Sequence, residues 1–205
     1  MKKLLLVLLL IVSVGGYAQV SWNAKAGINV SKRTQFDADM KIGYQFGVGM
    51  DYYFSEHWGI QPSIMLITKG FKVKGNYYYP PEWNDNLSKY NITENRIYLE
   101  VPIMLVYRFN VTENIKLVLN GGAYAGYGIG GKYKNKFTKK DGSTGNYDYN
   151  TFSLGSEKFD AGLGAGTTLE YLNKYTIGIM GEWGMKNTLG SSKNQTYGIN
   201  IGYKF

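Results

Sequence analysis

The sequence of 205 residues has no cysteine, only four prolines and a single histidine. Exported proteins often depend on disulfides, so without cysteine something else must hold an exported fold together. The thiol nucleophile is also missing from any chemistry that could be proposed. After residue 18 every apolar stretch is interrupted by polar residues, which excludes a spanning helix of roughly 20 apolar residues. What is abundant is 27 glycines, 19 tyrosines, nine phenylalanines and four tryptophans.

The N-terminus has the three parts of a secretory signal peptide. Lys2 and Lys3 are basic, residues 4–14 are apolar, and Gly16 and Ala18 put small residues at the −3 and −1 positions of a cleavage site. The apolar core is too short for a transmembrane anchor, which is the alternative. We expect residues 1–18 to be removed, which lowers the formal charge from +8 to +6 through loss of two lysines. Residues 19–205 then form one domain.

Large apolar side chains and small or polar ones alternate strictly over much of the remaining chain. From Ile42 to Phe54 the even positions are all apolar or aromatic, and the odd ones are mostly glycine or polar. Residues 97–109 and 197–205 alternate in the same way. A helix would mix the two sets, so these segments are strands. The alternation predicts eight of them: 20–31, 41–54, 58–71, 97–109, 115–130, 159–171, 175–187 and 196–205.

The connections between these strands alternate in length. Three are short, namely 55–57, 110–114 and 172–174, and four are longer, namely 32–40, 72–96, 131–158 and 188–195. Short turns on one rim and long loops on the other are typical of outer-membrane barrels, in which the short turns are periplasmic. The sequence therefore predicts an all-β fold, an eight-stranded antiparallel up-and-down transmembrane β-barrel in a bacterial outer membrane.

The apolar face carries aromatic residues near the strand ends, such as Trp22, Trp58 and Trp183, as in the girdles of membrane barrels. We expect this face to meet lipid. In the alternative, a soluble lipocalin-like barrel, it would turn inward, but the interior of eight strands could not hold so many rings. The opposite parity gives a lumenal set of charged residues, predicted to form an ion-pair network that plugs a narrow lumen. Its members are Lys25, Asp51, Lys69, Glu100, Arg108, Lys116, Asp160, Glu170, Glu182, Lys186 and Lys204.

Several ordered motifs run through the predicted strands. They are Gly43-Tyr44-Gln45-Phe46-Gly47-Val48-Gly49, Gly59-Ile60-Gln61-Pro62-Ser63, Thr68-Lys69-Gly70, Tyr98-Leu99-Glu100-Val101-Pro102, Phe159-Asp160-Ala161-Gly162-Leu163-Gly164-Ala165-Gly166 and Gly202-Tyr203-Lys204-Phe205. Together they resemble the porin-like outer-membrane β-barrel family common in Bacteroidetes, related in architecture to small barrels of the OmpX and OmpA type. Ser63 departs from the acidic residue usual in that family. The resemblance implies the fold and the location and no particular activity.

Two motifs that could carry catalysis are weak. Residues 126–132 have the glycine and lysine spacing of a phosphate-binding loop, but Tyr133 stands where a Ser or Thr must bind the metal, and no helix follows. The glycines at 122, 126, 128 and 130 share the lumenal parity and are better explained as room for larger neighbours. His57 and Ser55 lie in a predicted periplasmic turn with no partner to orient a base. No catalytic, cofactor or metal site is predicted.

The long loops are the remaining candidates for binding. Loop 72–96 holds the aromatic residues Tyr77, Tyr78, Tyr79, Trp83 and Tyr90, which either form a binding surface or pack on one another. Loop 131–158 holds Lys132, Lys134, Lys136, Lys139 and Lys140, which either meet phosphates of lipopolysaccharide or stay solvated.

The C-terminal Tyr203 and Phe205 resemble the signal by which barrels are handed to their assembly machinery. The expected partners are therefore outer-membrane lipid, lipopolysaccharide and that machinery, with no role for nucleic acid. We expect a non-enzymatic barrel that displays its loops for structural, adhesive or partner-binding roles. The alternatives are a small porin, an accessory barrel of a secretion machine, and a lipid A-modifying enzyme.

Overall fold

The computed structural model describes residues 19–34, 38–76, 87–153, 157–187 and 192–205, so the expected signal peptide lies outside it. The described residues form nine β-strands. Their bounds are β1 Gln19–Arg33, β2 Asp39–Tyr53, β3 Trp58–Asn76, β4 Leu87–Asn110, β5 Ile115–Lys139, β6 Thr144–Asn150, β7 Phe159–Tyr171, β8 Tyr175–Gly184 and β9 Asn194–Lys204. No helix in these ranges is long and apolar enough to cross a membrane.

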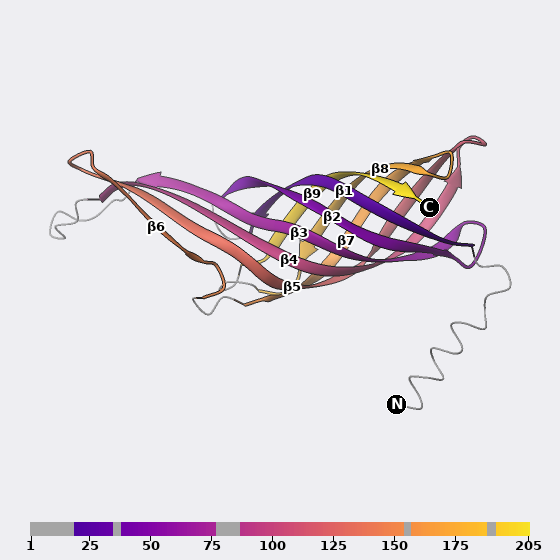
Figure 1. The fold of residues 1–205 in the computed structure, drawn as a ribbon, viewed down its shortest axis with the longest axis horizontal. Coiled ribbons are helices and arrows are strands. Elements are labelled where there is room, and N and C mark those ends of the chain that lie inside the picture. The colour runs from indigo at the N-terminus through magenta and orange to yellow at the C-terminus, as the bar shows by residue number, and fades with distance from the viewer. Residues whose placement is uncertain (1–18, 35–37, 77–86, 154–156, 188–191) are drawn as a thin grey trace, which may run out of the picture.

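Eight of the strands close into a ring in the order β4-β3-β2-β1-β9-β8-β7-β5, because β5 pairs back onto β4. All neighbours are antiparallel, and the two ends of the chain meet where β1 pairs with β9, from Asn23 opposite Lys204 to Arg33 opposite Asn194. The strands run obliquely around the long axis (Figure 1). The fold confirms the predicted eight-stranded antiparallel barrel.

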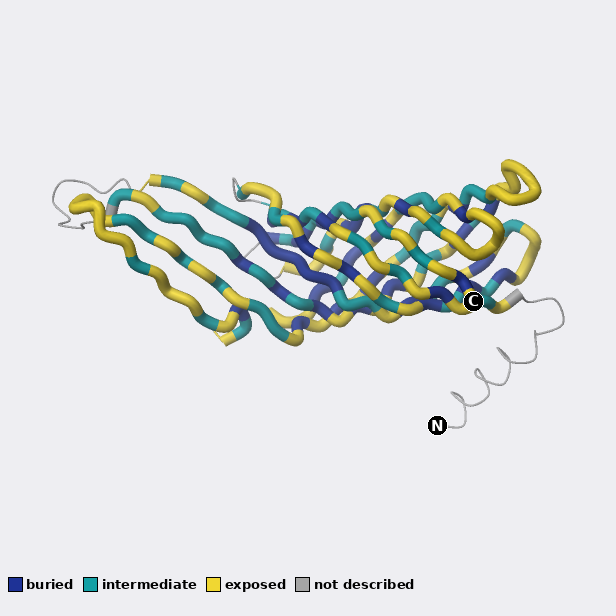
Figure 2. The backbone as a smooth tube through the Cα atoms, turned by 45° about the horizontal axis from the view of Figure 1, so that its top comes forward, coloured by how far each residue is buried: buried dark blue, intermediate teal, exposed yellow. Residues whose placement is uncertain are grey.

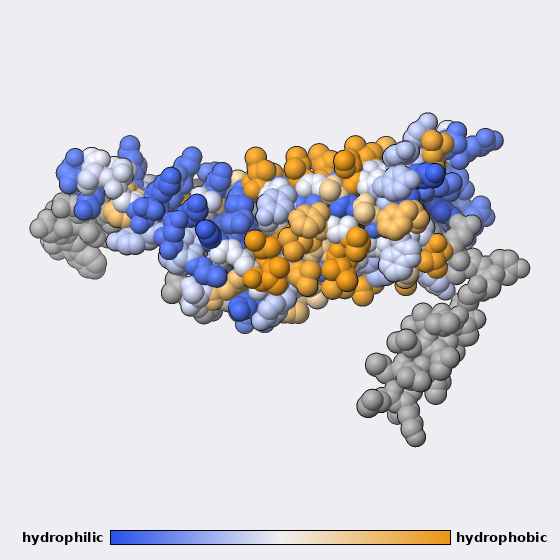
Figure 3. Space-filling model, in the orientation of Figure 1, coloured by the Kyte–Doolittle hydropathy of each residue, from blue (hydrophilic) through white to orange (hydrophobic). Residues whose placement is uncertain are grey.

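The apolar parity points outward, as the alternation predicted. Ile42 on β2 is 72 % exposed and Ile201 on β9 is 63 % exposed, whereas their polar neighbours in sequence turn inward. Figure 2 shows exposed and buried positions alternating along the barrel, and Figure 3 shows a hydrophobic band around its middle. A small apolar cluster of Tyr53, Val106 and Val118 lies inside the ring, but most of the buried interior is polar or charged. The inverted, lipocalin-like alternative is therefore wrong.

The short connections lie on one rim, together with the C-terminus (Figure 1). In the turn between β7 and β8, the N–H of Lys174 donates to the carbonyl of Tyr171 at 3.0 Å, and Leu172 and Asn173 have φ values of 53° and 57°. Positive φ at both central residues is the geometry of a type I′ turn, which matches the twist of the strands that it joins. Because such short turns are periplasmic in outer-membrane barrels, the opposite rim is extracellular.

The predicted loops 72–96 and 131–158 are wrong in large part, because β3, β4 and β5 continue well past the barrel. β3 runs to Asn76, β4 begins at Leu87, and β5 reaches Lys139 before the chain turns back as β6, which pairs with β5. We call this four-stranded sheet above the ring, residues 70–76, 88–95, 131–139 and 144–150, the extension; it projects to the left in Figure 1. Both of its faces lie outside lipid, so no apolar alternation marked it as strand.

A turn closes the hairpin of β5 and β6. The N–H of Ser143 donates to the Asp141 carboxylate at 2.8 Å, and hydrogen bonds from Ser143 hold the pKa of that carboxyl below its ordinary value. The charged form therefore belongs to the folded turn. The residues between β3 and β4 at 77–86, which include Tyr77, Tyr78, Tyr79 and Trp83, lie outside the described residues.

A closed ring predicts resistance to denaturing detergent. The protein refolded in detergent should migrate faster on a gel when it is not boiled than after boiling, because opening the ring exposes unpaired backbone groups of β1 and β9. The measurement is electrophoretic mobility before and after heating. Equal mobility for refolded protein would contradict a closed barrel.

Candidate functional site

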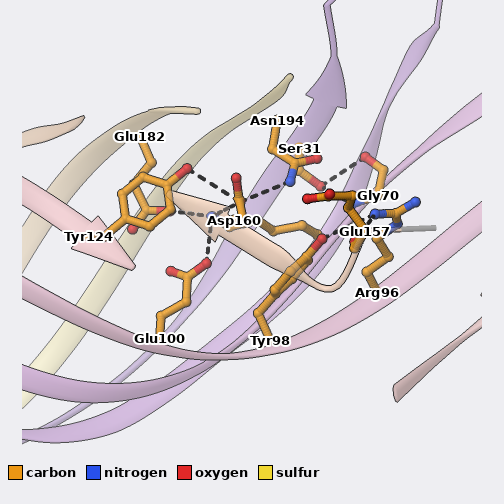
Figure 4. Close-up of polar contacts among 11 residues, drawn as sticks. Ser31, Gly70, Arg96, Tyr98, Glu100, Tyr124, Glu157, Asp160, Glu182 and Asn194 are labelled. Atoms are coloured by element: carbon orange, nitrogen blue, oxygen red, sulfur yellow. Dashed lines mark hydrogen bonds and ion pairs between the residues drawn. The ribbon is translucent and has the colours of Figure 1, made fainter. Parts of the chain in front are cut away.

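A buried ion-pair cluster centred on Lys69 crosses the lumen. Lys69 on β3 is fully buried, and its Nζ lies 2.6 Å from Glu100 on β4, 2.9 Å from Glu182 on β8 and 3.3 Å from Asp160 on β7. In the ring of eight, β3 and β8 are four strands apart in either direction. The contact between Lys69 and Glu182 therefore joins opposite walls. Figure 4 shows these carboxylates converging from different strands.

Polar and aromatic neighbours complete the Lys69 cluster. Asn194 donates from Nδ2 to Asp160 at 2.9 Å, and the hydroxyl of Tyr124 donates to the same carboxylate at 3.4 Å. The ring centroid of Tyr124 lies 4.2 Å from the Lys69 ammonium, a cation–π contact. Gly126 is needed beside them, because a Cβ there would come within 2.7 Å of the Glu100 side chain. Three carboxylates thus share one cation and a small set of donors.

A second cluster lies above the first, towards the extracellular side. Glu94 on β4 accepts contacts from Arg33 on β1 at 3.1 Å and from Arg96 on β4 at 3.0 Å. Arg96 also donates to the hydroxyl of Tyr98 at 3.2 Å. We did not predict these residues, because Glu94 and Arg96 fell in an assumed loop. The signal was present, since residues 94, 96 and 98 share the lumenal parity of Glu100.

A third cluster lies near the periplasmic rim. Lys204 on β9 lies 2.7 Å from Asp51 on β2 and 2.6 Å from Glu170 on β7. Asp51 also accepts hydrogen bonds from Asn23 and Gln61, and Gln61 accepts one from Lys25 at 2.9 Å.

Arg108 closes this end of the lumen. Its guanidinium lies 4.0 Å from the ring centroid of Tyr53 and donates to the carbonyl of Glu56 in the turn at 3.0 Å. The structure therefore brings nine of the 11 charges assigned to the lumen inside the ring. They are Lys25, Asp51, Lys69, Glu100, Arg108, Asp160, Glu170, Glu182 and Lys204.

The other two predicted lumenal lysines lie at the rims. Lys116 is half-buried and hydrogen-bonded to Asn173 of a periplasmic turn. Lys186 is a wrong assignment: β8 ends at Gly184, so the strand parity no longer applies, and the Lys186 side chain is 44 % exposed. It lies 3.1 Å from Glu157, outside the lumen.

Between the Lys69 and Lys204 clusters the lumen contains a cavity of about 70 Å³. Met65, Ile67, Met104 and Met180 line it, together with polar side chains that include Gln45. The Oε1 atom of Gln45 is buried with no protein partner. A volume of this size holds a few water molecules, which would satisfy such an atom.

The glycine row that resembled a phosphate-binding loop serves packing. A Cβ on Gly128 would lie 2.1 Å from the Phe152 ring, so this ring sits directly on the glycine. A register shift opposite Ile97 and Tyr98 turns Gly130 to the outer face, paired with Ile97, which corrects its predicted lumenal parity. In the described ranges no group of His, Asp and Glu side chains could hold a metal ion.

The residues weighed for hydrolysis are engaged in the turn between β2 and β3. His57 Nδ1 lies 2.9 Å from the carbonyl oxygen of Arg108, and its ring stacks on Tyr107 with centroids 5.5 Å apart. The hydroxyl of Ser55 accepts the backbone N–H of Trp58 at 2.9 Å. Within the described chain, the structure prints no contact between Ser55 and His57 that would activate a nucleophile.

Tyr203 and Phe205 face outward at the periplasmic rim, 42 % and 69 % exposed. Phe205 also closes the ring through its backbone, because its N–H donates to Trp22 at 2.9 Å and its carbonyl accepts from Trp22 at 3.1 Å. Of the predicted aromatic binding surface, only Tyr90 falls in the described residues. It lies on β4 within the extension, opposite Gly75 and Phe137.

A family model for an outer membrane protein beta-barrel domain matches residues 16–190. Three solved structures are similar at low identity. Neisserial surface protein A is 14 % identical, with a TM-score of 0.47, and the alignment covers 92 % of this chain and 99 % of that one. Ail of Yersinia pestis, solved with the heparin analogue sucrose octasulfate, gives 18 %, 0.45, 91 % and 99 %, and OprG of Pseudomonas aeruginosa gives 12 %, 0.44, 93 % and 98 %. No curated protein matches the sequence.

Proposed function

Because the chain belongs to the outer membrane protein β-barrel domain family and so lies in the bacterial outer membrane, we propose that it is a non-enzymatic barrel with a plugged lumen. Its function then resides in the extracellular extension, which it displays for adhesion or for binding a partner. The observation that carries the proposal is Lys69, whose ammonium touches carboxylates from three strands, one of them on the opposite wall.

The plug is supported by the cost of removing these contacts. A buried charge is stable only when it is paired, so a passage through the lumen would have to break the Lys69 and Lys204 clusters. The interior of eight strands is only wide enough for side chains. The cavity of about 70 Å³ between the clusters has room for water and none for a larger solute.

Display is supported by the unequal height of the wall. β4 and β5 have 24 and 25 residues, whereas β8 has 10, so one side of the barrel rises far above the other. A tilted strand needs only about 9–11 residues to span the membrane, so the additional length of β4 and β5 serves something outside it. The hydrophobic band stops below the extension in Figure 3.

The channel alternative gives the test. In planar bilayers the purified protein should show no steady nanosiemens-scale conductance, because the Lys69 and Lys204 clusters cross the lumen at two levels. The measurement is single-channel current, with empty detergent as the negative control and a reconstituted porin as the positive one. A reproducible steady step would overturn the plugged lumen and favour the porin.

A further inference from the structure

The two faces of the extension differ in character. Strand register places Lys132, Lys134 and Lys136 of β5 on one face, and Tyr133, Asn135 and Phe137 on the other. The tyrosine-bearing face continues the lumenal parity, since Tyr133 is opposite Glu94. On it, Tyr133 stacks on Tyr149 with ring centroids 4.7 Å apart, and Phe137 stacks on Tyr147 at 5.3 Å.

The lysine-bearing face continues the lipid-facing parity of the barrel. Across the four strands, the rows on this face run from Lys72 through Thr93 and Lys134 to Asp148, and from Lys74 through Asn91 and Lys136 to Asn146. We call it the basic face. It carries six lysines: Lys72, Lys74, Lys89, Lys132, Lys134 and Lys136.

Little on the described part of the chain neutralises this charge. Asp148 is the only acidic residue in the described rows of the basic face, and Asp39 of β2 borders it opposite Lys72. None of the six lysines forms an ion pair with a described carboxylate. Lys72 is half-buried and the other five are exposed. The basic face is therefore an unneutralised cationic surface.

The lower part of the basic face begins where the lipid-facing belt ends. Tyr127 and Ile129 on β5 are each 55 % exposed and mark the top of the belt. Lys132 follows three residues later, about 10 Å along the strand, and Lys134 a further 7 Å or so. A concavity of about 550 Å³ lies at this height, lined by Ile97 below and by Thr93, Asn95, Asn150, Lys132 and Lys134. Apolar surface thus passes directly into a polar, cationic hollow.

We infer that the lower basic face, Lys72, Lys132 and Lys134 with the adjoining hollow, binds the phosphate groups of anionic lipid in the outer leaflet. The lipid acyl chains lie against the belt below, and their headgroup phosphates lie at the level of these ammonium groups. Charge complementarity and continuity with the lipid-facing surface both favour a lipid headgroup over a soluble anion. The inference rests on the location of the chain and is independent of the display role.

The test compares two triple variants of equal charge. Lys72→Gln/Lys132→Gln/Lys134→Gln removes the lower basic face, and Lys139→Gln/Lys140→Gln/Lys174→Gln removes three exposed lysines from the hairpin end and a periplasmic turn. Bisphosphorylated lipid A is titrated calorimetrically into the protein in neutral detergent micelles at low salt. We expect the affinity of the first variant to fall roughly 10- to 100-fold, since each lysine near an anionic surface contributes about fivefold, and that of the second to stay near wild type.

Three results would overturn the inference. One is an equal loss in both variants, which would assign the effect to net charge. Another is no loss in the first variant although its unboiled form keeps the gel mobility of the folded barrel. The third is binding of inorganic phosphate with the same affinity and the same dependence on Lys132 and Lys134, which would indicate a site for a soluble anion.

Discussion

A Lys69→Met variant is expected to lose about 3–5 kcal/mol of unfolding free energy, the usual cost of removing one partner from a buried ion pair. The loss should lie at the upper end, because Glu100, Asp160 and Glu182 all approach the same ammonium within 3.3 Å and would face one another without it. The measurement is urea unfolding in phospholipid vesicles, followed by tryptophan fluorescence. The midpoint should fall by about 2 M.

Two further variants separate the ion pairs from simple packing. Lys69→Met combined with Glu100→Gln, Asp160→Asn and Glu182→Gln should recover most of the stability, since replacing a whole buried network can be nearly neutral. Lys74→Met, on the exposed extension, should change stability by no more than about 0.5 kcal/mol. If Lys69→Met and Lys74→Met shift the midpoint equally, the cluster does not stabilise the barrel.

Deleting Phe205 is expected to leave export intact while most of the protein fails to reach the membrane in folded form. Gly202-Tyr203-Lys204-Phe205 resembles the C-terminal signal read by the barrel-assembly machinery, and the 69 % exposed ring of Phe205 is accessible to such a receptor. Loss of its two backbone hydrogen bonds with Trp22 and of ring burial should cost only about 1–3 kcal/mol. Refolding in detergent should therefore be only slightly impaired.

The measurement for Phe205 is the ratio of membrane-inserted protein to periplasmic, protease-sensitive protein in cells. The matched control is Phe109→Ala, which removes another outward-facing ring, 42 % exposed, at the end of β4 and away from the C-terminus. It should affect refolding and cellular assembly to the same modest degree. If deletion of Phe205 harms refolding in detergent as much as assembly in cells, the ring is structural and no targeting role remains.

Within the membrane the sequence carried enough information to predict the barrel, because lipid and lumen impose opposite demands on neighbouring residues. A residue such as Ile42 must be apolar, and Lys69 on the other parity must find charged partners. The alternation therefore predicted eight strands and the parity of the lumenal charges. Which charges pair could not be predicted, since Lys69 and Glu182 meet only because the ring brings β3 opposite β8.

Outside the membrane the same information is lost. Both faces of the extension lie outside lipid, so Lys132, Tyr133 and Lys134 alternate in charge and aromaticity without the apolar contrast that marks a membrane strand. β6 and the upper parts of β3, β4 and β5 were therefore predicted as loops. The Arg33, Glu94 and Arg96 cluster was missed for the same reason, although its parity continues that of Glu100. Lys186 was misassigned because Gly184 ends β8.

The pairing of β1 with β9 has a consequence for how fast the barrel forms. Every other strand in the ring pairs with a strand close to it in the chain, whereas Asn23 and Lys204 are separated by nearly the whole mature sequence. Local hairpins can therefore form early, but the last seam must wait for two distant ends to meet, and such non-local contacts slow folding. Until then the edges of β1 and β9 expose unpaired backbone groups that could pair with other chains. Aggregation in the periplasm therefore competes with closure of this one seam.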